Sequence, residues 1–516
     1  MMAVKPDVFD FIVVGAGPAG CSVASALAKS KARPSVLLLE GGGDNNDPIL
    51  RHLTGFRGQI GNSEYNWGYV TEPIPALDGR RINMERGRGL GGSSAINESL
   101  WLRGARDDWE EAARVTGNDA WKWQNVEERY RLLENYHLDY GTNDEIRSRF
   151  RLESSTYGDK GPIHLSSWEA QWNADMFGFA DAWQACGHPI NPDPSRGDPI
   201  GISLSPLSSY DGRRSTAADM LDDAPANLHI LTESVVHRVL FENKTATGVL
   251  LTDGSVIKAS KEIIISAGAI DTPKILLHSG IGPVETLSKF EIPIVHANEH
   301  VGRGLKDHYY VTWFFVRPDR EPCEGIGTLF MKNDKVLASP EFQSLPHAVQ
   351  EHIKRPTIAA WEARQQGTAL MDWADAKGIM TRWAIFPQQI RSEGEVTIQS
   401  ADPKVSAKIR GSYMEHEWDK RVTIEATREA LRVVDQLMKR GLISQSPNNH
   451  FPRGDSDEEI LAFWTKNLRT GGHQCCSCRT GRSQDEEQAV VDPAFKVFGV
   501  QGLRIADMSV APFLFK

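Results

Sequence analysis

Apolar runs and a glycine-rich turn alternate along the first part of the chain in a pattern that predicts a βαβ unit. Residues 8–14, VFDFIVV, and residues 35–40, SVLLLE, are apolar runs of a length typical of buried strands. Between them, residues 18–30 place Ala, Val and Leu on one face of a helix. Because the order is strand, helix, strand, we expect both strands to run parallel in one sheet.

The turn after the first strand, GAGPAG, places Gly15, Gly17 and Gly20 in the G-x-G-x-x-G spacing. Gly15 permits a tight turn, Gly17 lets the backbone approach a pyrophosphate, and Gly20 lets helix and strand pack closely. The helix that follows would offer its free N–H groups to the phosphates. Glu40 ends the second strand, where a carboxylate can accept both ribose hydroxyls. The motif therefore predicts a dinucleotide site, with FAD and NAD both open.

The pattern along the rest of the chain predicts a second domain that interleaves with the first. Residues 227–266 return to a β pattern, and short β-rich segments reappear between residues 309 and 410. Two helical segments follow before a cysteine-rich stretch. We expect the nucleotide-binding domain to comprise residues 1–160, 206–308 and 471–516, and the second domain to comprise residues 161–205 and 309–470.

Composition and charge narrow the class of protein. The chain has 516 residues, of which 40% are hydrophobic and 24% charged, as is typical of soluble globular proteins. A net charge of -10 gives no indication of a nucleic-acid partner or an anionic membrane surface. The sequence shows neither a long apolar run nor the pattern of a signal peptide, so we expect a cytoplasmic protein without a membrane span. Six cysteines in a chain of this length do not predict a disulfide framework.

Two longer segments resemble the signatures of a known enzyme family. Residues 87–110, GRGLGGSSAINESLWLRGARDDWE, resemble the first signature of the glucose–methanol–choline (GMC) oxidoreductases, and residues 268–282, GAIDTPKILLHSGIG, resemble the second. Weaker family features follow the same order: STAADML from residue 215, VGRGLKDH ending at His308, and VVDPAFKVFGVQGLRIADMSV from residue 490. The resemblance covers nearly the entire chain. It implies an α/β, FAD-binding, Rossmann-like domain and an α+β substrate domain with a mainly antiparallel sheet.

The resemblance also implies the contacts of the cofactor, FAD. The residues that would line the flavin and its phosphates are Gly91, Gly92, Ser93 and Asn97. Val236 matches the position whose backbone contacts the adenine, and Asp507 matches an acid near the pyrophosphate and ribityl chain. Some members attach FAD covalently through a histidine just before the asparagine of the first signature. Ile96 takes that position here, so we expect non-covalent FAD.

The stretch HQCCSCRTG, which begins at His473, resembles the family segment H-x-x-G-T-C-x-M-G. The alignment places His473 at the catalytic histidine and Cys478 at the usual cysteine, while Cys476 replaces a glycine. Oxidation of an alcohol moves a hydride from carbon to flavin N5, which requires the hydroxyl proton to leave. A neutral imidazole can take that proton near neutral pH, so we expect His473 to act as the base.

The same stretch leaves two alternatives open for its thiols. Cys475 and Cys478 have the C-x-x-C spacing of redox dithiols and of zinc ligands. A structural zinc site needs a second pair of ligands, and Cys186 and Cys323 stand alone in the sequence. Packing beside the flavin is the role that we expect for these thiols, and we expect no metal.

The sequence after DMSVAP departs from the resemblance. In the family the chain continues, supplies a second catalytic residue, usually His or Asn, and ends in a helix that points at the flavin. This sequence stops at Lys516, so we expect the usual C-terminal segment to be missing. Such a chain would be an incomplete gene product, a short active enzyme or a redox-inactive relative. Loss of the helix would lower FAD affinity and expose apolar sheet surface.

Together these patterns predict an FAD-dependent oxidoreductase that acts on CH–OH groups. A small-molecule alcohol would reduce the flavin, and O2 or another acceptor would take the electrons. A flavin-binding scaffold for non-redox cyclisation or dehydration, or an inactive truncated relative, is the alternative. Aromatic residues that could line a substrate pocket, although tryptophans belong more often to a core, are Trp313, Phe314, Trp361, Trp373 and Trp383. The sequence predicts neither the substrate, nor oxidase or dehydrogenase activity, nor the oligomeric state.

Overall fold

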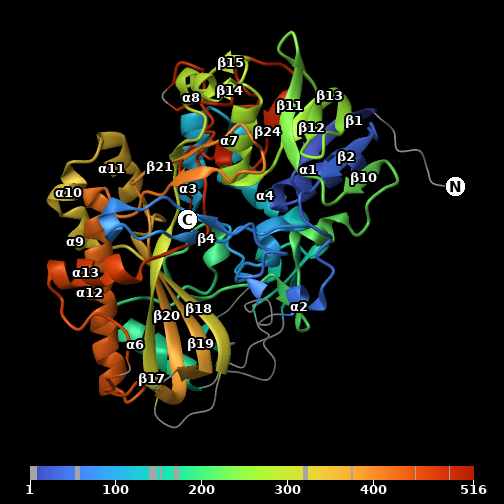
Figure 1. Cartoon of the computed structure of the whole chain (residues 1–516). Coiled ribbons are helices and arrows are strands. Elements are labelled where there is room, and N and C mark those ends of the chain that lie inside the picture. The colour runs from blue at the N-terminus through green and yellow to red at the C-terminus, as the bar shows by residue number, and fades with distance from the viewer. Residues whose placement is uncertain are drawn as a thin grey trace.

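The structure is a computed structural model. Its elements form two adjacent parts, each built on one main β-sheet with helices packed beside it (Figure 1). It describes residues 8–52, 59–138, 148–150, 154–167, 174–317, 323–373, 376–447, 449–486 and 488–515. One part is built on a largely parallel sheet with α1 and α7 beside it, and the other on a curved antiparallel sheet flanked by α6 and α12. This arrangement confirms the predicted fold class. The predicted domain boundaries stay a prediction.

A seven-stranded sheet, with strand order β10-β2-β1-β13-β12-β11 and β24 beside β13, forms the first part. The parallel strands are β1 (Val8–Val14), β2 (Val36–Leu39), β10 (Leu228–Leu231), β13 (Val256–Ile265) and β24 (Leu503–Ile505). The antiparallel strands are β11 (Val236–Glu242) and β12 (Thr245–Leu251). Helix α1 (Pro18–Lys29) joins β1 to β2, as the sequence predicts.

The central strands of this sheet are apolar along their length because both faces are covered. Ile12 and Val13 of β1 are fully buried and lie opposite Ile263 and Ile264 of β13. Helix α1 packs on one face through small side chains such as Ala24, which lets the helix axis approach the strands. Near-continuous apolar strands of this kind are typical of parallel sheets between helical layers.

A five-stranded antiparallel sheet, with strand order β18-β19-β20-β17-β23, forms the second part. Its strands are β17 (Tyr309–Arg317), β18 (Cys323–Met331), β19 (Trp361–Trp373), β20 (Ala376–Pro387) and β23 (Arg469–Thr470). The helices that pack on one face are α6 (Ala174–Ala185), α12 (Glu417–Lys439) and α13 (Asp457–Asn467). Successive side chains of a strand point to opposite faces, so only one face of this sheet belongs to the core.

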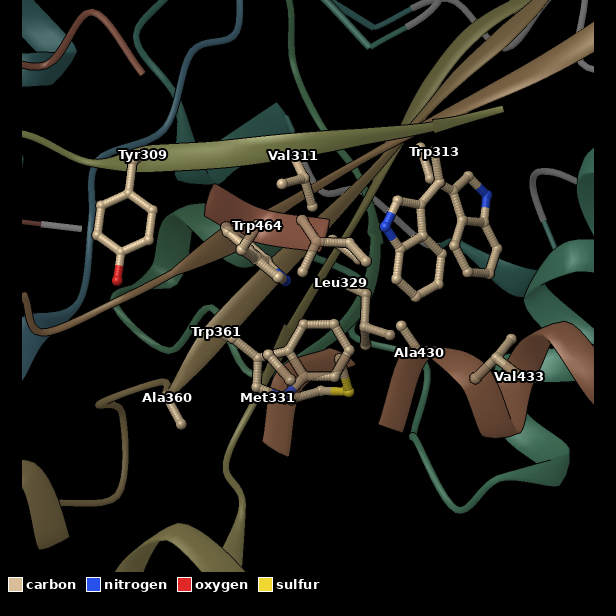
Figure 2. Packing of buried hydrophobic residues seen from close by; sticks show 14 of the residues in the cluster. Tyr309, Val311, Trp313, Leu329, Met331, Ala360, Trp361, Ala430, Val433 and Trp464 are labelled. Carbon is tan, nitrogen blue, oxygen red and sulfur yellow. The ribbon is translucent and has the colours of Figure 1, made fainter. Parts of the chain in front are cut away.

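Odd-numbered residues of these strands fill that core, as Figure 2 shows for Tyr309, Val311 and Trp313. Trp361 and Trp383 belong to the same cluster, and both are at most 1% exposed. The predicted tryptophans with described side chains are therefore core residues and do not line a substrate pocket. The side chain of Trp373 lies outside the described residues.

The remaining elements connect and cover the two sheets. The other helices are α2 (Pro48–Arg51), α3 (Arg106–Thr116), α4 (Trp123–Leu133), α7 (Gly268–His278), α8 (Val284–Lys289), α9 (Asp334–Leu337), α10 (Pro340–Gln343) and α11 (His347–Lys354). The other strands are β3 (Tyr69–Val70), β4 (Asn83–Met84), β5 (Glu134–His137), β6 (Ile163–Ser166), β7 (Gly201–Leu204), β8 (Ser209–Tyr210), β9 (Arg213–Arg214), β14 (Ile281–Gly282), β15 (His296–Ala297), β16 (Arg303–Leu305), β21 (Gly394–Thr397) and β22 (Lys408–Arg410). Among the described residues, no helix is both long enough and apolar enough to cross a lipid bilayer.

Candidate active site

A cavity of about 1500 Å³ lies between the two sheets. The carboxyl ends of β1 and β2 open into it through Val14 and Leu39, and the five-stranded sheet contributes Glu362 and Arg382 from the other side. Ligands of open α/β sheets bind at the carboxyl ends of the strands. The volume exceeds that of an ordinary small-molecule pocket, so a dinucleotide and a substrate fit together.

The glycine turn leaves no room for side chains on its protein-facing side. A Cβ atom at Gly20 would lie 1.8 Å from the carbonyl oxygen of Gly15, and one at Gly15, whose φ is +99°, would lie 2.5 Å from that of Ser266. A Cβ at Gly17 would meet no atom within 4 Å, because Gly17 faces the cavity at the N-terminus of α1. These three positions fit the turn, packing and pyrophosphate roles that the sequence predicts.

Replacing Gly20 with alanine is expected to destabilise the apoprotein by several kcal/mol, on the order of an overpacked core substitution, because the clashing oxygen belongs to the backbone. Gly17→Ala is the matched control: it should leave apoprotein stability nearly unchanged and weaken FAD binding alone. Urea unfolding of the apoprotein and FAD titration of each variant measure the two effects. Equal loss of stability in both variants would contradict this account of the turn.

Glu40 joins three loops at the edge of the cavity. Its Oε2 accepts the N–H of Ala16 at 2.8 Å, and its Oε1 accepts those of Gly42 at 2.8 Å and Gly89 at 3.0 Å. Burial raises the pKa of Glu40, although these amides favour the ionised form. A carboxylate offers about four acceptor positions, of which three are occupied. These three amides hold Glu40 in place at the cavity, and its role toward the ribose stays a prediction.

The segment of the first signature crosses beneath the glycine turn. Gly92 has a φ of +51°, and a Cβ there would lie 2.7 Å from the Cα of Gly17. Gly91 donates its N–H to the carbonyl of Ala16 at 2.9 Å, which ties the two loops together. Asn97 lines the cavity while its Oδ1 accepts a hydrogen bond of 2.8 Å from Arg214. The double glycine thus permits the close approach of two loops.

Asp507, on the wall of the cavity, joins the start of α7 to the turn that follows β24. Its Oδ2 accepts the N–H of Gly268 at 2.9 Å and the hydroxyl of Thr272 at 2.6 Å, and its Oδ1 accepts the N–H of Ser509 at 2.8 Å. Burial raises the pKa of Asp507. Val236, at the start of β11, also lines the cavity.

The structure brings most of the predicted site residues to one cavity. The lining residues are Gly15, Gly17, Glu40, Gly92, Ser93, Asn97, Val236, His473 and Asp507. Gly20 and Gly91 are absent from the lining and support it from behind, through the contacts given above.

His473 is exposed on the wall of the cavity and is held between two aromatic rings. Its Nδ1 lies 3.1 Å from Nδ1 of His308, and its imidazole stacks at 16° on the ring of Phe386, with centroids 6.3 Å apart. Burial inside the molecule, followed by the positive charges that His308 and two arginines can carry, holds the pKa of His473 well below its ordinary value. The imidazole is therefore neutral near pH 7 and able to accept a proton.

Asp307 positions the segment that carries His473. Its Oδ1 accepts the backbone N–H of His473 at 2.8 Å, and its Oδ2 accepts hydrogen bonds from Tyr413 at 2.7 Å, Thr470 at 2.5 Å and Gln474 at 3.0 Å. Burial raises the pKa of Asp307 to about 6. The sequence analysis missed this carboxylate, and its position just before His308 is the signal that could have found it.

The three cysteines beside His473 do not act as one group. Cys475 and Cys476 belong to the core of the five-stranded sheet, and Cys478 belongs to the core of the seven-stranded sheet. The thiols in contact are therefore the adjacent pair, with 3.1 Å between the Sγ atoms of Cys475 and Cys476, and not the C-x-x-C pair. Cys476 has a φ of +71°, a conformation that suits the glycine of the family motif. Within the described part of the chain, no three metal-ligating side chains gather.

The family models describe most of the chain. The two models named GMC oxidoreductase match residues 9–310 and 391–516. The chain is similar to the oxygen-dependent choline dehydrogenase of Sinorhizobium fredii, with 31% identity over 98% of this chain and 91% of the relative. It is also similar to the enzyme of the same name from Ectopseudomonas mendocina, with 30% identity over 98% and 90%.

Solved structures share the fold over the same length. A variant of the Aspergillus oryzae RIB40 formate oxidase superposes with a TM-score of 0.85 at 25% identity, covering 99% of this chain and 95% of that one. The pyridoxine 4-oxidase of "Mesorbium loti" superposes with a TM-score of 0.81 at 23% identity, covering 98% and 95%.

The expectation that the usual C-terminal segment is missing is wrong, because the C-terminal family model matches through residue 516. The structure gives the physical reason. β24 pairs with β13, and Met508, Leu514 and Phe515 line the cavity. The ring of Phe515 stacks on Trp109, with centroids 4.5 Å apart. The segment thus closes a wall of the site.

Proposed function

The chain belongs to the GMC oxidoreductase family, and from that premise we propose that His473 removes the hydroxyl proton of an alcohol in a site where bound FAD would supply the hydride acceptor. Its relatives are FAD-dependent oxidoreductases, and this chain is one that acts on CH–OH groups. One observation supports this role of His473. Its imidazole is neutral and is exposed on the wall of the cavity that lies between the two sheets.

The residues present fit FAD. Gly17 and the N-terminus of α1 would hold the pyrophosphate, Glu40 a ribose hydroxyl, and Val236 the adenine. When bound, FAD supplies the two-electron acceptor that the protein lacks. Ile96 offers no nucleophile for attachment to the ring, which supports non-covalent binding.

The contact between His473 and His308 is compatible with the proton-accepting form of the base. A neutral imidazole has one donor nitrogen and one acceptor nitrogen. When His473 Nδ1 donates to His308 Nδ1, the Nε2 of His473 is left to accept the substrate proton. After that transfer His473 carries a charge, and His308 still accepts the Nδ1 proton. His308 therefore orients His473, and Phe386 fixes the plane of its ring.

The visible spectrum of the purified chain, before and after anaerobic addition of an alcohol panel, tests this function. We expect a flavin spectrum that bleaches with at least one alcohol and returns on admission of O2 or an artificial acceptor. Dithionite serves as the positive control for a reducible flavin. A flavin that dithionite bleaches and no alcohol reduces would count against alcohol oxidation. The natural acceptor and the cytoplasmic location stay predictions.

A further inference from the structure

The cavity-facing side of the five-stranded sheet carries charged residues at alternate positions of otherwise apolar strands. Glu362 and Arg364 lie on β19, and Arg382 lies on β20. All three line the cavity, whereas their odd-numbered neighbours Ala363 and Trp383 are buried in the core. The strand period of two therefore places these charges in the substrate half of the site.

Arg382 has no partner among the described residues. Its guanidinium makes no hydrogen bond or ion pair with any of them, and its Nε is buried without an acceptor. Arg382 is half-buried, and an arginine in such a position normally pairs with an acid or donates to carbonyl oxygens, because even partial burial of an unpaired charge is unfavourable. A group from outside the chain would complete the hydrogen bonds of Arg382.

Arg364 is only partly occupied by its neighbour. Its Nε donates to Oε1 of Glu362, and its Nη2 lies 3.3 Å from Oε2 of the same side chain. A guanidinium carries five N–H donors, so further donors of Arg364 remain for a ligand. Because Glu362 neutralises Arg364, the charge of Arg382 leaves this face of the sheet with a net positive charge.

The strand register brings the two arginines to one place. Arg364 lies opposite Ala384, and Arg382 precedes Ala384 by two residues on the same face of β20. Diagonal neighbours of this kind on an antiparallel pair are about 7–8 Å apart. Ala384, which lies between them, carries only a methyl group and also lines the cavity. Both long side chains can therefore reach one anion.

We propose that Arg364 and Arg382 bind a carboxylate of the substrate, so that the alcohols oxidised by this enzyme are hydroxy acids. Guanidinium and carboxylate groups match in charge and in the geometry of paired N–H···O hydrogen bonds. The oxidation of the hydroxy acid rests on the proposed function. The binding of the carboxylate does not.

The ring of Phe386 lies beside both Arg364 and His473, the two ends of the proposed site. Its centroid lies 4.3 Å from the guanidinium carbon of Arg364 and 6.3 Å from the centroid of His473. The hydroxyl and the carboxylate of such a substrate are therefore separated by no more than about 10.6 Å, the upper limit that these two distances set between the imidazole centroid and the guanidinium carbon. A benzene ring or a short aliphatic chain between the two groups keeps them within this limit, and 4-(hydroxymethyl)benzoate is a suitable probe.

The same charges act against a cationic alcohol. Choline, which is part of the name of the matched bacterial relatives, carries a permanent positive charge. Like charges within a few ångström repel strongly inside a protein, where the dielectric is low. We therefore expect this chain to favour an anionic alcohol over choline.

Probes without the reacting hydroxyl test the binding alone. 4-Methylbenzoate and its neutral isostere 4-methylbenzamide are titrated by calorimetry into the FAD-bound full chain. We expect the carboxylate to bind roughly 10- to 100-fold more tightly than the amide, from hydrogen bonds to a charged group. Arg382→Gln should remove most of this difference and Arg382→Lys should restore part of it. Arg303→Gln, at a side chain that is 50% exposed, should leave it unchanged.

Equal affinity of wild type for the two probes would overturn the proposal. A variant Arg382→Gln that loses affinity for both probes equally would also overturn it, because the effect would then be one of packing.

Anaerobic flavin reduction tests the hydroxy acid itself. 4-(Hydroxymethyl)benzoate should give a kcat/KM roughly 10- to 100-fold above that of 4-(hydroxymethyl)benzamide, and choline should be the poorest of the three. Arg382→Gln should lower the value for the acid alone. If the carboxylate probe binds tightly but no alcohol reduces the flavin, the proposed function is rejected. The proposal that Arg364 and Arg382 bind a carboxylate would still stand. Reduction by acid and amide at equal rates would reject the hydroxy acid.

Discussion

Replacing His473 with alanine is expected to slow flavin reduction by alcohol roughly 10²- to 10⁴-fold, the contribution of a positioned general base. The flavin should stay bound, because the predicted cofactor contacts lie on other segments. Stopped-flow reduction of the FAD-bound variant under anaerobic conditions measures the rate. Added imidazole should restore part of it, since the substitution leaves space for a free base. His347→Ala, at a side chain that is 87% exposed, is the matched control.

The pH dependence of the wild-type rate supplies a second test of His473. Burial and neighbouring positive charge lower its pKa, so the imidazole stays neutral below its ordinary titration range. A base must be neutral to accept a proton. The reduction rate should therefore stay constant from neutral pH down through about 6.5, the ordinary pKa of histidine, and fall only at more acidic pH. A rate that falls with an ordinary histidine pKa, or a His473→Ala variant within a few-fold of wild type, would contradict the assignment.

Local motifs made the cofactor half of the site predictable. The G-x-G-x-x-G spacing, the strand before it and the helix after it lie within one short segment, and the structure reproduces their order with α1 at Pro18–Lys29. Sterics explain this success, since Gly15 and Gly20 allow no side chain at their positions. Glu40 shows the limit of such inference. Its place in the chain was clear, but three backbone amides from separate loops already occupy its carboxylate.

The substrate half of the site is formed by residues that are far apart in the sequence and meet only in the folded protein. No short sequence motif predicts such contacts. Arg364 and Arg382 become neighbours only through the register of β19 with β20. His308 and His473 meet although they are 165 residues apart in the chain. The packing of Phe515 on Trp109 likewise joins residues that lie far apart in the sequence. Alternation of apolar and charged residues in β19 and β20 was the available signal.

Substitution of Asp307 is expected to lower both the stability of the protein and the rate of flavin reduction. Four hydrogen-bond donors share this one buried carboxylate as their acceptor. Asp307→Ala should lower the free energy of unfolding by about 3–5 kcal/mol, since it leaves buried donors without an acceptor. It should also slow flavin reduction, because the backbone of His473 loses its hydrogen bond to Asp307. Asp307→Asn keeps one of the two acceptor oxygens, so it should lose less of both properties than Asp307→Ala. Urea unfolding and stopped-flow reduction of the FAD-bound variants measure them.

The pH dependence of stability separates the charge of Asp307 from its hydrogen bonds. Its pKa is about 6 in the folded protein and 3.8 ordinarily, so the folded state holds the proton more tightly than the unfolded state. The stabilisation from this proton is complete below pH 4 and is lost as the pH rises through 6, by about 3 kcal/mol in total. Asp307→Asn cannot titrate. Wild type should therefore gain stability relative to Asp307→Asn as the pH falls from 6 to 4, and a difference that stays constant over this range would show that Asp307 is ionised throughout.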